Sequence, residues 1–180
     1  MSTSSGGHRA PGIARSVAPG IGEHDRAIGD TASVTFSDAD VQALVGYRFP
    51  GGRYRIEHWE NFLLTDCTGA DQLPDGLVHP IALFHVPILG SGMTITKLFE
   101  LGGAAAHSGS VGLEGYDWEY LRPLREDVDY VIEGGIVSAE RKTTDTGQVY
   151  DAVAFTIELS DDEGVAARIT NRWRFRRNLS

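Results

Sequence analysis

The feature that most constrains the fold is a strand that stops at a proline and then starts again. The residues up to Tyr120 are β-type, Arg122-Pro-Leu-Arg125 interrupts them, and a long β-type run extends from Val128 to Arg141. Proline lacks the backbone N–H that a sheet interior needs, so it belongs at a strand end or a bulge. The segment therefore predicts two successive strands joined by a short break.

The C-terminal part of the chain predicts an antiparallel meander. Strands are expected over Ser110–Tyr120, Val128–Arg141, Tyr150–Leu159 and Val165–Arg176. Turn residues at Asp145-Thr-Gly147 and at Ser160–Gly164 predict hairpins between the last three. In the final strand Trp173 and Phe175 alternate with arginines, which indicates one apolar and one polar face.

The front half of the chain predicts helices. They are expected after Ser37, over Tyr54–Thr65, over Leu77–Leu89 and over Thr94–Leu101. In the second helix the positions expected to face the core are Ile56, Trp59, Phe62 and Leu63, and those expected on the other side are Glu57, Glu60 and Asn61. In the third, Pro80 suits the first turn, and Pro87 is expected to bend or end the helix. Helices followed by a meander make an α+β fold.

Composition limits the class of protein. Residues 1–31 are rich in Ser, Gly, Pro and Ala and predict a flexible tail before a single domain over residues 32–180. The formal charge of −9 disfavours binding to nucleic acid or to an anionic membrane. No apolar run is long enough to span a membrane, and the N-terminus lacks the apolar stretch of a secretory signal. The lone Cys67 excludes an intrachain disulfide and suits a reducing compartment, so a cytoplasmic protein is expected.

From about Val34 to Arg177 the chain resembles the MaoC-like hydratase branch of the hot-dog superfamily. The resemblance is most specific at Arg122-Pro-Leu-Arg125 and at the ending Trp-Arg-Phe-Arg-Arg of residues 173–177. It implies a hot-dog fold, in which a curved antiparallel sheet wraps around a central apolar helix. It also implies (R)-specific enoyl-CoA hydratase or 3-hydroxyacyl dehydratase activity on acyl thioesters of coenzyme A or a carrier protein.

The catalytic pattern of that branch is present in degenerate form. The family has D-x-N-P-x-H in the loop before its helix, where the Asp and His hold a water and backbone N–H groups polarise the thioester carbonyl. This chain has Asp71-Gln-Leu-Pro74-Asp-Gly76 in the corresponding place, so Leu73 replaces the Asn and Gly76 replaces the His. The resemblance therefore implies Asp71 as one catalytic residue and leaves the histidine to be found elsewhere.

Two histidines are candidates for the missing residue. His79 lies at the expected start of the apolar helix, and a histidine ordinarily titrates near pH ~6.5, which suits proton transfer. The alternative is a structural histidine that caps or packs at this helix start. His85 lies six positions further, too far round a helix to bind a metal together with His79. It is expected in the core or against substrate, with a catalytic role left open.

The remaining site expectations depend on the pair Asp71 and His79. With that pair, Gly76, Leu77 or Val78 is expected to supply the amide that polarises the carbonyl. Arg174, in the basic final strand, is expected to contact phosphates of the substrate's carrier, and the alternative is a solvated sheet face or a subunit contact. Glu60 and Asp66 are carboxylates for a thioesterase-type mechanism, although a solvated position and a helix end are favoured for them. No metal and no cofactor are expected.

Two classes of function remain, with a third behind them. The first is a hydro-lyase that interconverts 3-hydroxyacyl and 2-enoyl thioesters, and the second is a non-catalytic hot-dog subunit that completes a heteromeric hydratase. The third is an acyl-CoA thioesterase. Because hot-dog domains pair sheet edge to sheet edge, and a long unpaired edge is an aggregation hazard, a homodimer or a heterodimer is expected.

Overall fold

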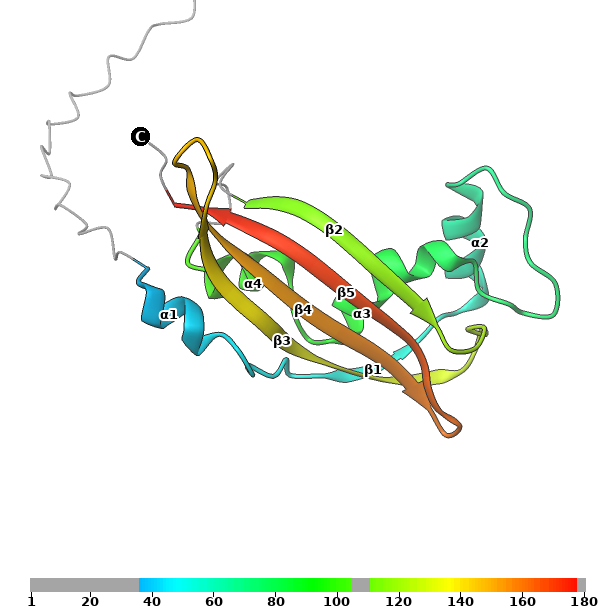
Figure 1. The fold of residues 1–180 in the computed structure, drawn as a ribbon. Coiled ribbons are helices and arrows are strands. Elements are labelled where there is room, and N and C mark those ends of the chain that lie inside the picture. Colours follow the sequence, from blue (N-terminus) through cyan, green and yellow to red (C-terminus); the bar gives the residue numbers. More distant parts are fainter. Residues whose placement is uncertain (1–35, 105–110, 178–180) are drawn as a thin grey trace, which may run out of the picture. The chain divides into compact units, whose positions relative to one another are not determined.

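The computed structural model describes residues 36–104 and 111–177, and the tail predicted over residues 1–31 lies outside them. A five-stranded antiparallel sheet has the order β1-β3-β4-β5-β2 (Figure 1). Its strands are β1 (Gly52–Arg55), β2 (Val111–Tyr120), β3 (Asp129–Thr143), β4 (Val149–Asp161) and β5 (Gly164–Arg176). The helices are α1 (Asp38–Ala43), α2 (His58–Asp66), the 3-10 helix η1 (Pro80–Phe84), α3 (Val86–Gly90) and α4 (Ile95–Leu101). The α+β prediction is confirmed.

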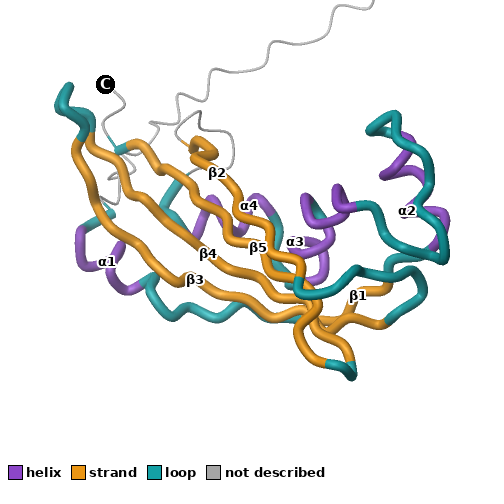
Figure 2. Tube along the Cα trace, turned by 45° about the vertical axis from the view of Figure 1, so that its right-hand side comes forward, coloured by secondary structure: helices purple, strands orange, loops and turns teal. Residues whose placement is uncertain are grey.

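The core lies between the curved sheet and the helices η1, α3 and α4 (Figure 2). On β4 the residues Val153, Phe155 and Ile157 are buried and alternate with partly exposed neighbours. Because successive side chains of a strand point to opposite faces, this alternation places one apolar face under the helices. The predicted strands and the hairpins between them are confirmed, with boundaries shifted by one or two residues. No helix in residues 36–104 or 111–177 is long and apolar enough to cross a membrane.

The short N-terminal helix forms as predicted. The Ser37 hydroxyl accepts a hydrogen bond from the Asp40 backbone N–H at 3.2 Å, and the Asp40 carboxylate accepts one from the Ser37 backbone N–H at 2.7 Å. This reciprocal capping box pairs two backbone donors that the first turn of a helix leaves free. The local sequence alone is sufficient to start α1.

Strand β1 is absent from the sequence prediction, which has a turn and the beginning of a helix there. Its residues show no apolar alternation, and their pairing with β3, from Gly52 opposite Ile132 to Arg55 opposite Asp129, makes the strand. Gly52 also allows a close approach, since a Cβ at this position would lie 2.5 Å from the Gly90 carbonyl oxygen. The strand therefore depends on its partners rather than on its own pattern.

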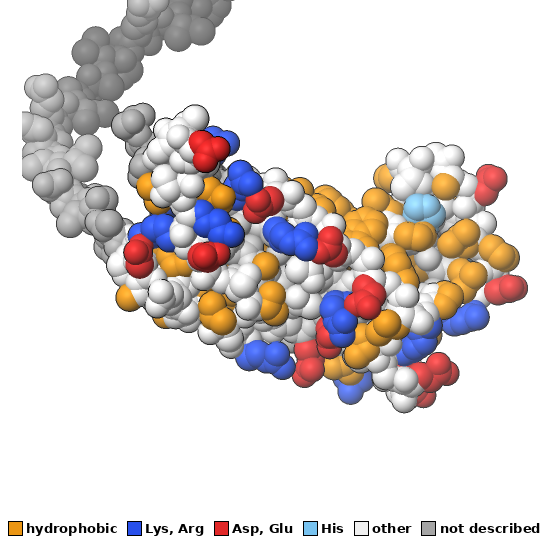
Figure 3. Space-filling model, viewed as in Figure 1, with side chains coloured by type: hydrophobic (Ala, Val, Ile, Leu, Met, Phe, Trp, Pro, Cys, Tyr) orange, Lys and Arg blue, Asp and Glu red, His pale blue; other side chains and the backbone are white. Residues whose placement is uncertain are grey.

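The helix predicted over Tyr54–Thr65 begins later, at His58, and turns its other face inward. Trp59, Phe62 and Leu63 are 60%, 47% and 51% exposed, whereas Glu60 and Asn61 are 9% and 1% exposed. The predicted orientation is therefore wrong for these five residues, whereas Ile56, which lies before the helix, is buried as expected. The apolar side chains lie on the surface of the molecule, where Figure 3 shows hydrophobic side chains over α2.

The apolar helix predicted over Leu77–Leu89 is divided into two short pieces. Helix η1 ends at Phe84 and α3 begins at Val86, and His85 between them has a φ of −129°. Pro87 lies in the first turn of α3, where its missing N–H is tolerated, which agrees with the predicted bend. Gly90 packs so closely on β3 that a Cβ there would lie 2.1 Å from Ile132 Cδ1.

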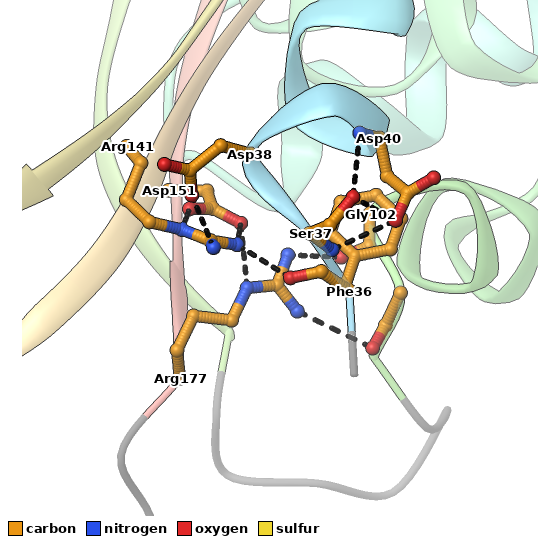
Figure 4. A network of polar contacts seen from close by, with 9 residues as sticks. Phe36, Ser37, Asp38, Asp40, Gly102, Arg141, Asp151 and Arg177 are labelled. Carbon is orange, nitrogen blue, oxygen red and sulfur yellow. Dashed lines mark hydrogen bonds and ion pairs between the residues drawn. The ribbon is translucent and has the colours of Figure 1, made fainter. Parts of the chain in front are cut away.

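A buried carboxylate joins the ends of the central strands (Figure 4). Asp151 on β4 is fully buried and accepts hydrogen bonds from Arg141 Nε at 2.7 Å and Arg177 Nε at 2.6 Å. Arg141 also contacts Asp38 of α1 at 2.5 Å, and Arg177 donates to the Gly102 carbonyl at 2.5 Å. The network therefore connects α1, β3, β4, the end of β5 and the residues after α4.

The substitution Asp151→Asn should destabilise the protein strongly. It leaves two guanidinium groups facing a buried position without their counter-charge, and breaking such a pair costs about 3–5 kcal/mol. Asp38→Asn is the matched control, because the Asp38 side chain is 74% exposed and its ion pair is worth less than about 1 kcal/mol. Urea unfolding of both variants measures the difference. Similar small losses for the two would contradict this account of the network.

Candidate functional site

A carboxylate, an imidazole and a phenol from three elements meet on the inward face of α2. Glu60 of α2 accepts a hydrogen bond from the Tyr54 hydroxyl of β1 at 2.7 Å. His85, between η1 and α3, places its Nε2 3.5 Å from the same Glu60 oxygen. The Glu60 side chain is 11% exposed and that of His85 is 34% exposed, so the pair is held inside the fold and opens to solvent on the His85 side.

The environment of Tyr54 keeps its proton in place. Burial, and then the hydrogen bond to Glu60, raise the pKa of Tyr54 to about 12. The phenol is therefore neutral at physiological pH and donates to the carboxylate. This leaves Glu60 oriented by Tyr54 and adjacent to a partly accessible imidazole, which is an arrangement that can pass a proton between a carboxylate and a histidine.

Asn61, the next residue on α2, holds the segment that precedes η1. Its Nδ2 donates to the Leu77 carbonyl at 3.1 Å and to the Glu126 carboxylate at 2.7 Å. Its Oδ1 accepts from the His79 backbone N–H at 2.9 Å. A single buried amide thereby fixes the start of η1 relative to α2, and through it the position of His85.

Glu126 is charged in this environment. Burial alone would raise the pKa of Glu126, but hydrogen bonds from Asn61 and from His58 oppose it and leave the pKa below its ordinary value of 4.5. The Glu126 side chain is 13% exposed and lies 3.0 Å from His58 Nδ1. The carboxylate is therefore a fixed acceptor at neutral pH.

The predicted partners Asp71 and His79 have different surroundings in the structure. His79 is the N-cap of η1, where its Nδ1 accepts from the Ile81 backbone N–H at 3.2 Å. This is the capping role that the sequence offers as an alternative. Asp71 is exposed in the loop after α2, and no hydrogen bond or ion pair within the described part of the chain joins it to His79.

The three amides predicted to polarise a carbonyl differ in their availability. The Leu77 N–H donates to the Pro74 carbonyl at 3.1 Å, and the Val78 N–H donates to the Leu124 carbonyl at 2.9 Å. These two are occupied, so Gly76 is the candidate that is left. Gly76 has a φ of +67°, a conformation that strains any residue with a Cβ, and a histidine there would be disfavoured in this loop.

Arg174 lies apart from the other predicted site residues. It is on the outer face of β5, where it pairs with Glu114 and stacks over the Tyr150 ring at 4.8 Å. Figure 3 shows such pairs of basic and acidic side chains across this face. The opposite end of β5 is the one close to η1. Ala167 at that end pairs with Tyr120, whose hydroxyl donates to the Pro80 carbonyl at 2.7 Å. Arg174 lies seven residues along the strand from Ala167, or about 23 Å. It therefore lies on a solvated sheet face, which is one of the alternatives that the sequence offers for it.

Sequence reasoning places Glu60 on a solvated helix face and does not select Tyr54. Helical spacing assigns Glu60 to the polar side of α2, and Tyr54 falls in a strand that only its partners reveal. His85 is the one predicted site residue that the structure places beside a buried carboxylate. Within residues 36–104 and 111–177, no group of three or more His, Cys, Asp or Glu side chains could hold a metal ion.

Stability should depend on pH through Glu126. A carboxyl whose pKa is lower in the folded state stabilises the fold above the unfolded value, here 4.5, and loses that contribution as pH falls through the lower folded value. The unfolding free energy lost in Glu126→Gln should therefore be largest at neutral pH and shrink below pH 4.5. Urea unfolding from neutral to acidic pH measures it, with the exposed Glu133→Gln as control. A difference that stays constant with pH would refute this assignment.

Comparison with known proteins supports the fold. No family model matches the chain, and no curated protein matches it. The ChsH1-ChsH2 complex from Mycobacterium tuberculosis matches with a TM-score of 0.56 and 14% identity over 79% of this chain and 90% of that chain. A monoamine oxidase regulatory protein from Archaeoglobus matches with a TM-score of 0.53 and 11% identity over 75% and 92%.

A third solved structure is similar to the same extent. The C-terminally truncated HadBC complex, a 3R-hydroxyacyl-ACP dehydratase from Mycobacterium tuberculosis, matches with a TM-score of 0.52 and 11% identity, over 71% of this chain and 93% of that chain. At these identities the likeness concerns the backbone and not the site residues. Together with the sheet order and the helices on its inner face, it shows that this chain has an α+β hot-dog fold.

Proposed function

We propose that this chain is an acyl-thioester hydro-lyase in which Glu60 and His85 form the acid–base pair. The observation that carries the proposal is the convergence of Glu60, His85 and Tyr54 at the break between η1 and α3. The hot-dog fold and the dehydratase named among the similar structures support the substrate class. Glu60 and His85 take the roles that the sequence assigns to Asp71 and His79.

The proposed reaction adds water across the double bond of a 2-enoyl thioester. Glu60 accepts a proton from the water, whose oxygen bonds to the β-carbon, and His85 donates a proton to the α-carbon. The reverse steps release water from a 3-hydroxyacyl thioester. Tyr54 orients the carboxylate through its hydrogen bond, and the Gly76 N–H is the proposed donor to the thioester carbonyl.

A second candidate is a non-catalytic subunit of a heteromeric hydratase. It is favoured by Gly76 at the place of the family's histidine, and a free sheet edge offers a partner chain a place to pair. Strand β2 pairs with β5 on one side, and no other described strand pairs with its free edge. Beside that edge Phe84 and Tyr116 stack at 5.7 Å, and Trp118 is 37% exposed. The two Mycobacterium tuberculosis structures described above are complexes by name.

For either candidate we propose that a second hot-dog chain pairs with the free edge of β2. The partner's edge strand would continue the sheet and satisfy the free backbone groups, and the aromatic strip of Phe84, Tyr116 and Trp118 would be covered. A homodimer and a heterodimer both satisfy this requirement, and the acyl-thioester site beside η1 would then lie close to the interface.

Hydration of short 2-enoyl-CoA substrates by the purified chain tests the catalytic proposal. Glu60→Gln and His85→Gln should each lower kcat/KM by about 10²–10⁴-fold, the usual range for one acid–base group. Asp71→Asn is the matched control, since its carboxylate is exposed, and it should change kcat/KM by less than about 3-fold, or about 0.7 kcal/mol.

The opposite result would support Asp71 and His79 as the acid–base pair. If Asp71→Asn and His79→Ala abolish turnover while Glu60→Gln retains it, the proposed assignment of Glu60 is wrong. Hydration that appears only with a second chain supports the subunit candidate. Hydrolysis of saturated acyl-CoA that is lost in Glu60→Gln would instead indicate a thioesterase.

A charge placed beside the free edge of β2 should break the proposed dimer. Trp118→Lys should shift the protein from dimer to monomer at micromolar concentration, because a lysine at a sheet edge opposes strand pairing. Val137→Lys is the control, since Val137 is 55% exposed on β3, away from β2 in the sheet. Size-exclusion chromatography with light scattering gives the masses. A wild-type monomer, or a dimer that only Val137→Lys dissociates, would contradict the proposed interface.

A further inference from the structure

The inner face of the sheet contains one buried amide without a partner. Asn171 of β5 is fully buried, and among the described residues neither its Nδ2 nor its Oδ1 has a hydrogen-bond partner. An unpaired buried polar group costs stability, and natural structures retain few of them. A residue of similar volume without polar atoms, such as leucine, would fill this position at lower cost. Both ends of the Asn171 amide are therefore left free by the described part of the chain and could bond to a bound molecule.

The surroundings of Asn171 are aromatic. Its neighbours across the sheet are Phe155 on β4 and Tyr116 on β2, and Trp173 follows it on the same face of β5. Phe155 and Trp173 stack at 5.3 Å. Tyr116 stacks at 5.7 Å on Phe84, the residue directly before His85. The aromatic residues beside Asn171 therefore extend, through Tyr116 and Phe84, to the residue that precedes His85 in the sequence.

The helices that cover this part of the sheet are two short pieces rather than one continuous helix. Helices η1 and α3 meet at His85, and Pro87 cannot donate the hydrogen bond that would join them into one helix. A small apolar cavity of about 10 Å³ is lined by Phe155 and Trp173, which are neighbours of Asn171, and by Leu98 of α4. The packing therefore leaves a small space beside these two aromatic residues, and the cover over the sheet consists of two short helices rather than one long helix.

We propose that Asn171 determines the specificity of the acyl-binding site and takes substrates whose acyl chain carries an oxygen beyond its third carbon. This inference rests on the proposed binding of acyl thioesters. The acyl chain extends from His85 past the Phe84–Tyr116 pair and along the aromatic surface, and the Asn171 amide hydrogen-bonds to a ketone or hydroxyl on the chain. The substrate class is an oxygenated acyl thioester rather than a plain fatty acyl thioester.

The chemistry of the amide accounts for this selectivity. Nδ2 can donate to a ketone, and a hydroxyl can bond to either end of the amide. A plain alkyl chain of the same length would leave both ends unpaired in an apolar site. The loss of one such hydrogen bond corresponds to an affinity difference of about 10-fold.

Isothermal titration calorimetry on the full chain tests the proposal without requiring turnover. The probes are octanoyl-CoA and its keto-octanoyl-CoA isomers, with the ketone at successive carbons beyond the third. The wild type should bind one isomer about 10-fold more tightly than octanoyl-CoA, and Asn171→Leu should bind the two alike. The control is Thr170→Val on the opposite face of β5, where Thr170 contacts the Thr156 hydroxyl at 3.1 Å, and it should keep the preference.

The thermal midpoint provides a second readout. Removing an unpaired amide should raise the Tm of ligand-free Asn171→Leu by about 2–4 °C. A lower Tm with an unchanged preference would mean that the amide is paired within the protein, for example by a buried water, and would overturn the inference.

The wild-type measurements separate this inference from the proposed function. Equal affinity for all probes would overturn the inference alone, whether or not the variants fold. The absence of any acyl-CoA binding would overturn the proposed function as well.

Discussion

The placement of the helices against the sheet depends first on the charge balance around Asp151. Its carboxylate is buried at the start of β4, directly opposite Arg141 on β3, and Arg177 reaches it from the residue after β5. A carboxylate in this position is tolerated only while both guanidinium groups face it. The same two arginines bond to backbone carbonyls at Phe36 and Gly102, so the approach to α1 and the end of α4 are fixed by the same charges. The network therefore ties this end of the sheet to α1 and to the end of α4, and α2 lies at the other end (Figure 1).

The parts of the fold that could be predicted are those in which neighbouring residues carry the signal. Ser37 and Asp40 cap α1 through contacts three residues apart, and β4 shows its buried face in simple alternation. Strand β1 could not be predicted because its pairing with β3 joins segments about eighty residues apart. The orientation of α2 could not be predicted either. Periodicity considers only which side chains are apolar. It does not detect that Asn61 hydrogen-bonds to the backbone at Leu77 and His79, or that Glu60 accepts a hydrogen bond from Tyr54.

In the candidate site, too, the features with a local sequence signal could be predicted and the others could not. The motif at Asp71 lies in the loop between α2 and η1, and its role stays a prediction, whereas the alternative for His79, a helix cap, is what the structure has. Glu60 and His85 meet only after β1, α2 and η1 have packed, so no local pattern could pair them. Their pairing depends on Asn61, a residue that the sequence places on the solvent side. For Arg174 the sequence shows a local signal, a basic strand, that the fold changes. Acidic residues of β2, such as Glu114, lie beside the arginines of β5 and form ion pairs with them.

The reversed orientation of α2 has a consequence for how the molecule opens. Trp59, Phe62 and Leu63 contribute little buried area, and α2 is joined to the rest of the fold by the hydrogen bonds of Glu60 and Asn61 and by the partly buried Leu64. Segments with few buried apolar contacts exchange their amide hydrogens through local opening, well below the free energy of global unfolding. Opening of α2 would remove Glu60 from His85 while the sheet stays folded. The proposed acid–base pair would therefore depend on the local stability of one helix, and it could separate in a molecule whose sheet is still fully folded.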